Sequence, residues 1–374
     1  MPNSPVANCK LIISDDKKIY FFSPKHKIIK IRKKIRNIKI SYHEEEDFFQ
    51  VVSSLKNGKF CIDSQTCSVL NEELIKSKFS IIFKNDPIYM FKSIKNKKEI
   101  KNMKDAHVKD GIALTKFLYW IKKVQINKLT EQDVEKKLEN FRKKSNNYLY
   151  PSFNTIAGSG PNGAIIHYKS NKNSNRKLNK KDLLLVDSGG QYKWGTTDVT
   201  RTMCFSKVSQ KIKEVFTRVL KGHIAMALTN IKKAKTGHNI DKIARKSLNS
   251  VGLDYRHGTG HGVGFFLNVH EGPQSISKNN MVTLKEGMIV SNEPGFYSEN
   301  KYGIRIENLV FIKKNKQNLN FENLTFAPID KDLIDFKMLT NYEKNYLFNY
   351  HLETYVKISP YLKKNEKRWL ANLI

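Results

Sequence analysis

The chain has 374 residues, 39% of them hydrophobic, so it is long enough for two domains with separate cores. No run of about 18 apolar residues occurs and residues 1–10 lack the pattern of a secretory signal, so we predict neither a membrane span nor export. The formal net charge is +32, but lysine is spread along the chain, and even the densest run, Lys27–Lys39, is interleaved with isoleucine. Spread charge attracts polyanions without specificity, so no specific nucleic-acid partner is predicted. The cysteines form no CxxC pair and are read as free thiols of a reducing, cytoplasmic compartment: Cys9, Cys61, Cys67 and Cys204.

The first 92 residues alternate strand-like and helix-like runs and contain no catalytic cluster. Two β-branched and aromatic runs, Leu11–Ser14 and Lys18–Ser23, are split by two aspartates, which predicts a hairpin. Apolar spacing predicts a helix over Glu45–Leu55. Two further short strands are expected, Phe60–Ile62 and Ser80–Phe83. Residues 1–92 are therefore expected to form a small α/β domain.

Residues 93–374 are expected to form a larger α+β domain. Apolar spacing and a capping box predict helices over Ile100–Lys123, from Thr130 onward, over Ser209–Lys232 and over Asn239–Ser250. The first of these should bury one stripe: Val108, Ile112, Phe117, Trp120 and Ile121. Strands are expected over Thr155–Ala157, Leu183–Val186, Thr202–Phe205, Met288–Asn292 and Ile304–Ile312. A second capping box, Thr340 with Glu343, begins a helical tail that reaches Trp369 and Leu370. Helices that alternate with antiparallel strand pairs favour a sheet with helices on its outer face.

Two aspartates are the first candidate metal ligands. Asp187 ends an apolar strand and is followed by two glycines, which permit a tight turn. Asp198 lies eleven residues later on the expected return strand, so a hairpin would set the two carboxylates side by side. Buried carboxylates at one point repel each other unless cations neutralise them. The alternative is that both aspartates only cap the turn of this hairpin.

Three of the ten histidines fall within fourteen positions: His257, His261 and His270. The glycines between them let the backbone pass close to a ligand. A lone histidine is more often structural, but three in one glycine-rich segment indicate a site. The segment is not the zinc-binding HExxH helix, because no glutamate lies inside that pattern.

Two glutamates complete the set. Glu293 and Glu307 both lie in or at the end of apolar strands, where a buried glutamate is rare unless it is paired or metal-bound. Arg305 lies two residues before Glu307, so a structural Arg–Glu pair on one strand face is the alternative. The whole set comprises four carboxylates and one imidazole: Asp187, Asp198, His261, Glu293 and Glu307. Such a set can hold two divalent cations that share one water or hydroxide, which predicts metal-assisted hydrolysis.

The order and spacing of these segments resemble the pita-bread metallopeptidases, which include methionine aminopeptidase, prolidase and aminopeptidase P. The segments that look most like the long cytosolic form of aminopeptidase P are His257–Pro273, Glu293–Tyr297 and Gly303–Asn308, together with Ser152–Tyr168. The resemblance is specific over about residues 90–374 and weaker over residues 1–90. It implies a pita-bread catalytic domain with a C-terminal helical extension, preceded by a small creatinase-type domain.

The resemblance also implies a role for each ligand. Asp187 would hold one metal ion, and His261 with Glu293 the other, while Asp198 and Glu307 would bridge both. Manganese is the expected ion, with cobalt, iron and zinc as alternatives. A metal-bridged hydroxide would attack the first peptide carbonyl, and Glu293 would accept a proton from the water.

Further residues match the substrate-binding positions of the family. His167, His257 and His270 would bind substrate, stabilise the intermediate and pass protons. Tyr297 would line a pocket for proline, and Arg305 would orient Asp198 or close that pocket. The implied partners are peptides with proline at position two, from which the N-terminal residue would be released.

The long form of aminopeptidase P carries another N-terminal domain ahead of the middle one, and we expect this chain to lack it. The oligomeric state, including a homodimer, and the preference between dipeptides and longer peptides therefore stay open. Three other readings stay open as well: an Xaa-Pro dipeptidase (prolidase), a methionine aminopeptidase, and a non-catalytic pita-bread protein that binds peptides, histones or RNA.

Overall fold

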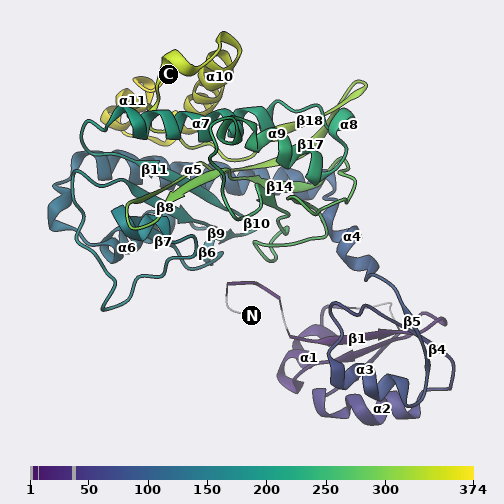
Figure 1. Ribbon diagram of the computed structural model, residues 1–374. Coiled ribbons are helices and arrows are strands. Elements are labelled where there is room, and N and C mark those ends of the chain that lie inside the picture. Colours follow the sequence, from purple (N-terminus) through teal and green to yellow (C-terminus); the bar gives the residue numbers. More distant parts are fainter. Residues whose placement is uncertain (1–2, 7, 36–38) are drawn as a thin grey trace. The chain divides into compact units, whose positions relative to one another are not determined.

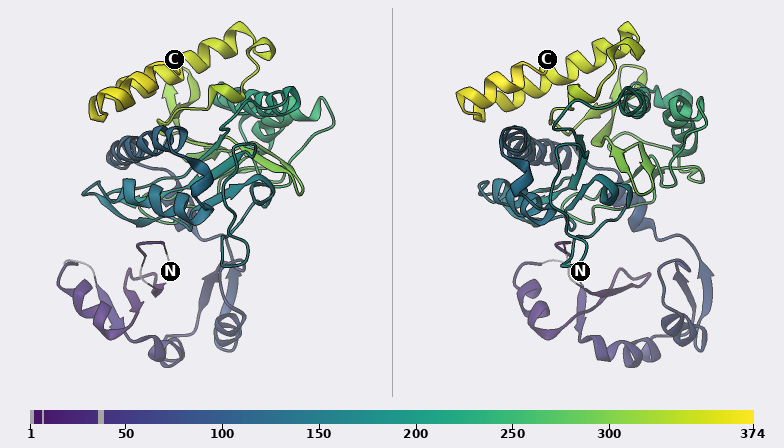
Figure 2. Two further views of the ribbon diagram at one scale, coloured as in Figure 1. Left: turned by 90° about the vertical axis from the view of Figure 1, so that its left-hand side faces the viewer. Right: turned by 60° about the vertical axis from the view of Figure 1, so that its left-hand side comes forward.

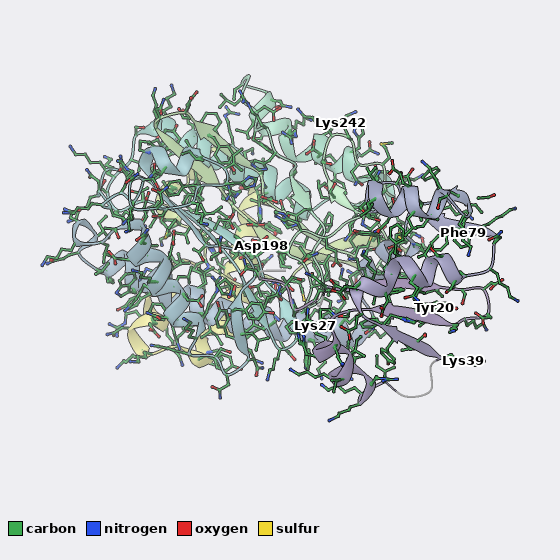
Figure 3. The ribbon with its side chains drawn as sticks, turned by 90° about the horizontal axis from the view of Figure 1, so that it is seen from below. Tyr20, Lys27, Lys39, Phe79, Asp198 and Lys242 are labelled. Atoms are coloured by element: carbon green, nitrogen blue, oxygen red, sulfur yellow. The ribbon has the colours of Figure 1, made fainter. Side chains whose placement is uncertain are left out.

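The computed structural model describes residues 3–6, 8–35 and 39–374 (Figure 1). The chain forms two compact units, Val6–Tyr89 and Met90–Ile374, and residues 3–5 belong to the second. Part of the basic run expected at Lys27–Lys39, namely residues 36–38, lies outside the described residues. Lys39 in the first unit and Lys242 in the second are exposed at the periphery of their units, where Figure 3 labels them.

The first unit is a small α/β fold. Its elements are β1 (Lys10–Ile13), β2 (Ile19–Phe22), α1 (Lys25–Arg32), β3 (Ile40–His43), α2 (Phe48–Ser54), β4 (Lys59–Ile62), α3 (Val69–Lys76) and β5 (Ser80–Phe83). The predicted hairpin is confirmed, because β1 and β2 pair antiparallel. The sequence did not predict β3, which pairs parallel to β2, or α1, which begins the basic run. Its core includes Phe22, Val52 and Ile75. The short helix α4 (Pro87–Ser93) leads out of this unit.

The second unit is an α+β fold, as predicted. Its helices are α5 (Lys97–Lys123), α6 (Glu131–Arg142), α7 (Gln210–Ala227), α8 (Ile231–Ala234), α9 (Gly237–Asn249), α10 (Asn341–Ile358) and α11 (Lys364–Ala371). Short 3-10 turns include η3 (Gly160–Ala164) and η4 (Lys331–Leu333). Its strands are β6 (Tyr148–Pro151), β7 (Ile156–Ser159), β8 (Leu184–Ser188), β9 (Gly190–Tyr192), β10 (Gly195–Thr196), β11 (Val199–Met203), β12 (Gly260–His261), β13 (Ser275–Ile276), β14 (Ile289–Asn292), β15 (Gly295–Ser298), β16 (Tyr302–Arg305), β17 (Asn308–Asn315) and β18 (Asn318–Asn323).

Two three-stranded sheets carry most of the candidate ligands. One has the order β11-β8-β7 and the other β14-β17-β18, and the pairings within both are antiparallel. Helices α5 and α6 pack against the first sheet through Phe117, Leu138 and Leu184. Helices α7 and α9 pack against the strands that flank the other candidate ligands.

The first long helix differs from its prediction in length and in buried face. It begins at Lys97, because Asn96 and Glu99 form a capping box there. Phe117 and Ile121 are buried as expected, but Val108 and Ile112 are only partly buried. They face a second cluster formed by Phe326, Ile358 and Leu370 of the C-terminal region. The helix therefore has two apolar faces, which a single stripe cannot describe.

Two predicted elements are interrupted. The helix expected over Ser209–Lys232 ends at Ala227, and Asn230 then caps the separate short helix α8 through its side chain. The strand expected over Ile304–Ile312 is divided into β16 and β17, so Glu307 lies between two strands rather than within one. Because Glu307 lies outside both strands, its backbone amide donates to Thr200 of β11 instead.

The C-terminal helices lie along one side of the second unit (Figure 2). The capping box at Thr340 and Glu343 is confirmed at the start of α10, as is the one at Thr130 and Asp133 at the start of α6. Leu347 and Tyr350 of α10 pack into the same cluster as Phe216 of α7.

Among the described residues, the structure contains no helix with the length and apolar character needed to cross a membrane.

Candidate metal centre

The five predicted ligands lie in or next to three strand pairings that meet at one place: β8–β11, β12–β13 and β14–β17. Asp187 lies within β8, Asp198 directly before β11 and His261 in β12. Glu293 follows β14, and Glu307 separates β16 from β17. The expected pairing of the two aspartate segments is present, with Asp187 opposite Thr200 in the antiparallel β8–β11 register. The additional hairpin β9–β10 lies between them, so it is not the simple turn that the sequence suggested.

Backbone hydrogen bonds fix the ligand segments to one another. The Glu307 amide donates to the Thr200 carbonyl at 3.1 Å, and the Glu293 amide donates to the Thr259 carbonyl at 2.8 Å. Next to His261, the chain approaches β14 so closely that a Cβ atom on Gly260 would lie 2.0 Å from the Ser291 carbonyl oxygen. Only glycine fits this approach, which explains why the histidine segment is glycine-rich.

The side chains form two overlapping groups of candidate ligands. Ligand atoms of Asp187, Asp198 and Glu307 lie within 4.8 Å of one another, and so do those of His261, Glu293 and Glu307. His261 Nε2 lies 3.4 Å from Asp198 Oδ2 and 3.4 Å from Glu293 Oε1. Glu307 is common to both groups, so the structure brings all five residues together.

The electrostatics of the cluster favour bound cations. Burial, reinforced by the charges of Asp187 and Glu293, raises the pKa of Asp198 well above its usual range. Burial and the charge of Asp198 raise the pKa of Glu307 in the same way. Asp187 Oδ1 and Asp198 Oδ1 are buried and have no hydrogen-bond partner within the described part of the chain. Buried carboxylates in this condition are the donor set of a hard divalent ion, so the residues fit a metal site.

Arg305 binds a different carboxylate from the one we expected. Its Nη2 donates to Asp187 Oδ2 at 2.6 Å, and its Nη1 donates to the Tyr297 hydroxyl at 2.6 Å. The structure therefore pairs Arg305 with Asp187 rather than with Asp198, and the alternative of a simple Arg305–Glu307 pair is wrong. The sequence could place Arg305 and Glu307 two positions apart on one strand face but could not show which strand lies opposite Arg305.

Tyr297 connects Arg305 to His257. Its hydroxyl lies 2.8 Å from His257 Nε2, and His257 Nδ1 lies 2.7 Å from the Gly258 carbonyl. Burial raises the pKa of Tyr297 to about 12, so its hydroxyl keeps its proton. Because the Gly258 carbonyl can only accept, the proton of the neutral His257 ring lies on Nδ1, and Nε2 accepts from the Tyr297 hydroxyl. Burial also lowers the pKa of His257, which favours this neutral imidazole.

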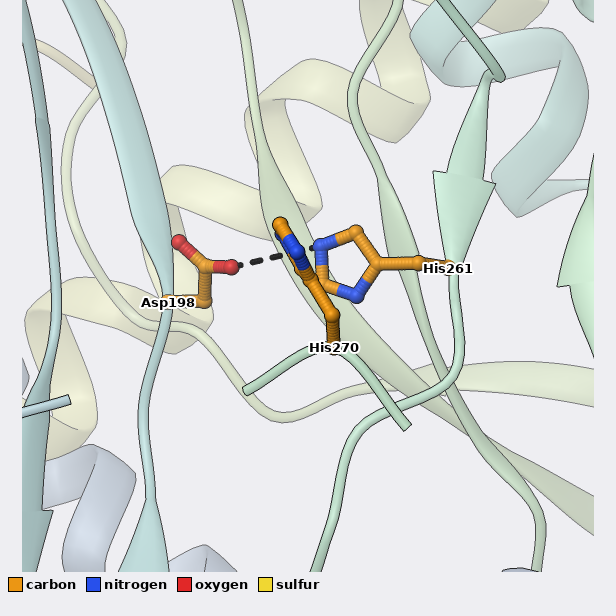
Figure 4. A group of neighbouring side chains, drawn as sticks. All are labelled: Asp198, His261 and His270. Carbon is orange, nitrogen blue, oxygen red and sulfur yellow. Dashed lines mark ion pairs between the residues drawn. The ribbon is translucent and has the colours of Figure 1, made fainter. Parts of the chain in front are cut away.

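The other two predicted histidines lie at the edge of the cluster. The ring centroids of His270 and His261 are 4.2 Å apart, and the two ring planes are inclined at 67°. Figure 4 shows both rings beside Asp198. Atoms of Asp198, His261 and His270 also fall within 4.8 Å of one another. Partial desolvation, with His261 beside it, lowers the pKa of His270 to about 4. His167 is exposed after η3 and belongs to none of the groups of candidate ligands.

Two hydroxyl residues support the ligands and were missed in the sequence. The Thr200 hydroxyl donates to Glu307 Oε2 at 2.7 Å and accepts from Arg305 Nε at 3.1 Å. The Ser291 hydroxyl donates to Glu293 Oε1 at 2.9 Å and accepts from the His261 amide. Each precedes or follows a ligand by two positions, so alternation along a strand was the signal that could have found them.

Comparisons with known proteins define the class. Residues 101–314 match metallopeptidase family M24, residues 317–373 match the C-terminal region of peptidase M24, and residues 1–99 match the creatinase/prolidase N-terminal domain. The chain therefore belongs to metallopeptidase family M24, as the sequence motifs predicted.

Among its relatives, aminopeptidase P2 of Arabidopsis thaliana is 39% identical over 416 residues, which include 100% of this chain and 58% of that protein. Xaa-Pro aminopeptidase 1 of Dictyostelium discoideum is 43% identical over 79% of this chain and 50% of that protein. The crystal structure of an X-prolyl aminopeptidase from Caenorhabditis elegans, described as a cytosolic enzyme with a di-nuclear active site, has a TM-score of 0.89 at 30% identity. The match covers 100% of the present chain and 64% of the C. elegans chain. The chain thus spans about half the length of the curated relatives that it matches.

The Thr200 hydroxyl should strengthen metal binding through Glu307. Thr200→Val keeps the side-chain shape but removes the donor to Glu307, so we expect divalent-metal affinity to fall by about 10-fold. Isothermal titration of the metal-free protein with Mn²⁺ measures this. Thr354→Val is the matched control, because it removes a buried hydroxyl that bonds only to the Tyr350 carbonyl within α10. Equal Mn²⁺ affinity in the two variants would contradict the role of Thr200.

Proposed function

We propose that this chain is a dinuclear-metal aminopeptidase that releases the N-terminal residue from peptides with proline in the second position. The observation that carries the proposal is the pair of candidate ligand groups that share Glu307, set beside the linked side chains of His257, Tyr297 and Arg305. The relatives that bear the name Xaa-Pro aminopeptidase support the same substrate class.

Each half of the cluster would hold one ion. Asp187 with the shared Asp198 and Glu307 would hold one, and His261 with Glu293 and the shared carboxylates would hold the other. Four carboxylates and one imidazole suit manganese, with cobalt, iron and zinc as alternatives. When bound, two divalent ions would lower the pKa of a water molecule and polarise the scissile carbonyl.

The chain's own residues would move protons and hold the ligands in place. Glu293, oriented by Ser291, would accept the proton of the attacking water. His270 is exposed beside the cluster, where it would contact the substrate carbonyl region and relay the proton held by Glu293 to the leaving nitrogen. Arg305 would hold Asp187 in its ligating orientation. His167, which is exposed, would bind the substrate further from the reacting bond.

His257 has a more specific role in this proposal than the sequence implied. Both of its ring nitrogens are within hydrogen-bond distance of protein groups, Gly258 and Tyr297. We therefore assign it the positioning of Tyr297, with direct substrate contact possible only when that hydrogen bond opens. The His257 and Tyr297 rings, with centroids 5.4 Å apart, would offer apolar faces to a proline ring. A proline imide has no N–H, so recognition by ring contact suits it better than recognition by a hydrogen bond.

A cytoplasmic location is part of the proposal. The structure contains four free thiols, two of them exposed, which is typical of a reducing compartment. The C. elegans relative is described as cytosolic.

The nearest rival is a prolidase, which is specific for Xaa-Pro dipeptides, and a substrate panel separates the two. With Mn²⁺ supplied, we expect release of the first residue from Xaa-Pro-Yaa tripeptides and longer peptides at rates at least about 10-fold above those for Xaa-Pro dipeptides. Chelation of the metal should abolish the release, because the carboxylate cluster alone cannot activate water. Cleavage confined to dipeptides would establish the prolidase reading. Absence of both cleavage and bound metal would favour a non-catalytic binding protein.

The shared ligands should be the most sensitive to substitution. Asp198→Asn and Glu307→Gln keep the side-chain size but remove a charge that both ions would need. We expect both variants to lose bound metal, measured by elemental analysis, and to lose activity by at least about 1000-fold. Glu322→Gln, a surface carboxylate paired with Lys104 and Lys313, is the control and should retain both. Full activity in either ligand variant would rule out a shared role.

The histidines should affect turnover without affecting metal content. His257→Ala and His270→Ala should each lower kcat by about 100-fold, which is the usual scale for a proton-transfer or substrate-positioning group. Two metal ions per chain should remain in both variants. Metal loss in His270→Ala would show instead that His270 is a ligand, consistent with its distance to Asp198 and His261.

A further inference from the structure

A buried ion pair lies directly beside the loop that carries His270. Glu271 follows His270 in the chain, and only 2% of its side chain is exposed. Its Oε1 lies 3.8 Å from Lys95 Nζ, and its Oε2 lies 3.3 Å from Lys92 Nζ. The Lys95 side chain is completely buried. Both lysines belong to the segment that precedes α5, which the cluster of candidate ligands does not include.

This lysine segment is attached to the strand that leads to a candidate ligand. The Lys95 amide donates to the Gly287 carbonyl at 3.0 Å, and Ile94 pairs with Met288 in an antiparallel bridge. The strand β14 begins at the next residue and ends directly before Glu293. Lys95 is therefore presented from a backbone that is fixed relative to the metal centre.

Glu271 is also bonded to the start of the loop that contains His270. Its amide donates to the Gly262 carbonyl at 2.8 Å, and the Gly262 amide donates to the Gln274 carbonyl at 3.0 Å. The loop backbone also packs tightly on the Glu271 side chain, because a Cβ atom on Gly264 would lie 2.7 Å from Glu271 Oε2. A shift of the Glu271 carboxylate would therefore move the loop that begins beside His261 and contains His270.

Stability does not explain why these charges are buried. The ammonium of Lys95 and both carboxylate oxygens of Glu271 have no direct hydrogen-bond partner in the described ranges of the chain. A buried ion pair with such geometry is often less stable than an apolar pair of the same size, although removing one partner alone is costly. Burial lowers the pKa of Lys95 to about 8 against the opposing charge of Glu271, so Lys95 is still mainly protonated at pH 7.

We propose that Lys95 and Glu271 are positioning residues that hold the His270 loop against the metal centre. The inference deepens the proposed function, because it assigns the orientation of His270 to a charge that comes from the segment ahead of α5. Lys92, at 28% side-chain exposure, reinforces the pair from the solvent side.

A double-mutant cycle tests the proposal with Lys95→Met, Glu271→Gln and the combined variant. Lys95→Met removes the buried cation beside Glu271 Oε1 and leaves the carboxylate facing Lys92 at the solvent side, so the loop should shift toward solvent. We expect kcat on an Xaa-Pro-Yaa tripeptide to fall by about 10- to 100-fold, with KM within about twofold and two metal ions still bound. The combined variant carries no buried charge at either position and should recover most of the lost kcat, which is a non-additive result.

Hydrogen exchange of residues 262–274 provides a readout that is independent of activity. Lys95→Met should accelerate exchange there, and the combined variant should restore protection. The control is Lys122→Met. Lys122 lies near the C-terminal end of α5, and its Nζ is 2.6 Å from Oδ2 of the buried carboxylate of Asp330, so this variant also removes the cation of a buried ion pair. It should change neither kcat nor exchange in this loop.

Two results would overturn the inference: loop exchange in Lys95→Met that equals the control, or kcat losses that add in the combined variant. If the wild-type protein did not cleave peptides, the proposed function would fail, while the exchange cycle would still decide whether the pair orders the loop.

Discussion

Mutual repulsion among buried carboxylates is the constraint on which the rest of this structure depends. Four acidic side chains converge around one imidazole, and Asp198 and Glu307 are held where burial and neighbouring charge oppose their ionisation. A fold that depended on its core alone would gain nothing from such a cluster. The arrangement is favourable when cations occupy it, so the surrounding strands are best understood as a scaffold that keeps acidic groups close until ions bind.

The scaffold meets this constraint with rigid connections between ligand segments. The Glu307 backbone bonds to the aspartate sheet and the Glu293 backbone bonds to the histidine segment, so these two ligands do not depend on their own strands alone. Hydroxyl groups of Thr200 and Ser291 then fix the individual carboxylate oxygens. Arg305 contacts Asp187 with its positive charge and extends the network to Tyr297 and His257. The proposed ion ligands and the proposed substrate-binding groups thus form one continuous network.

Much of the site was predictable because its signals are local. An aspartate before two glycines, glycines between histidines and glutamates at the ends of apolar strands each depend on a few neighbouring residues. The α+β class and both capping boxes were predictable for the same reason. What could not be predicted depends on distant partners. Three features follow from which segments pack together. They are the pairing of Arg305 with Asp187, the break between β16 and β17 at Glu307, and the end of α7 at Ala227. The second apolar face of α5 exists only because the C-terminal helices cover it, and the Lys95–Glu271 pair joins residues far apart in the chain.

We propose that this cluster holds two ions that share Glu307. The most direct measurement is anomalous X-ray diffraction at the manganese absorption edge, from crystals of the protein grown with Mn²⁺. We expect two anomalous peaks, one beside Asp187 and one between His261 and Glu293, with Glu307 and Asp198 in contact with both. A single peak, or two peaks of which only one contacts Glu307, would contradict it.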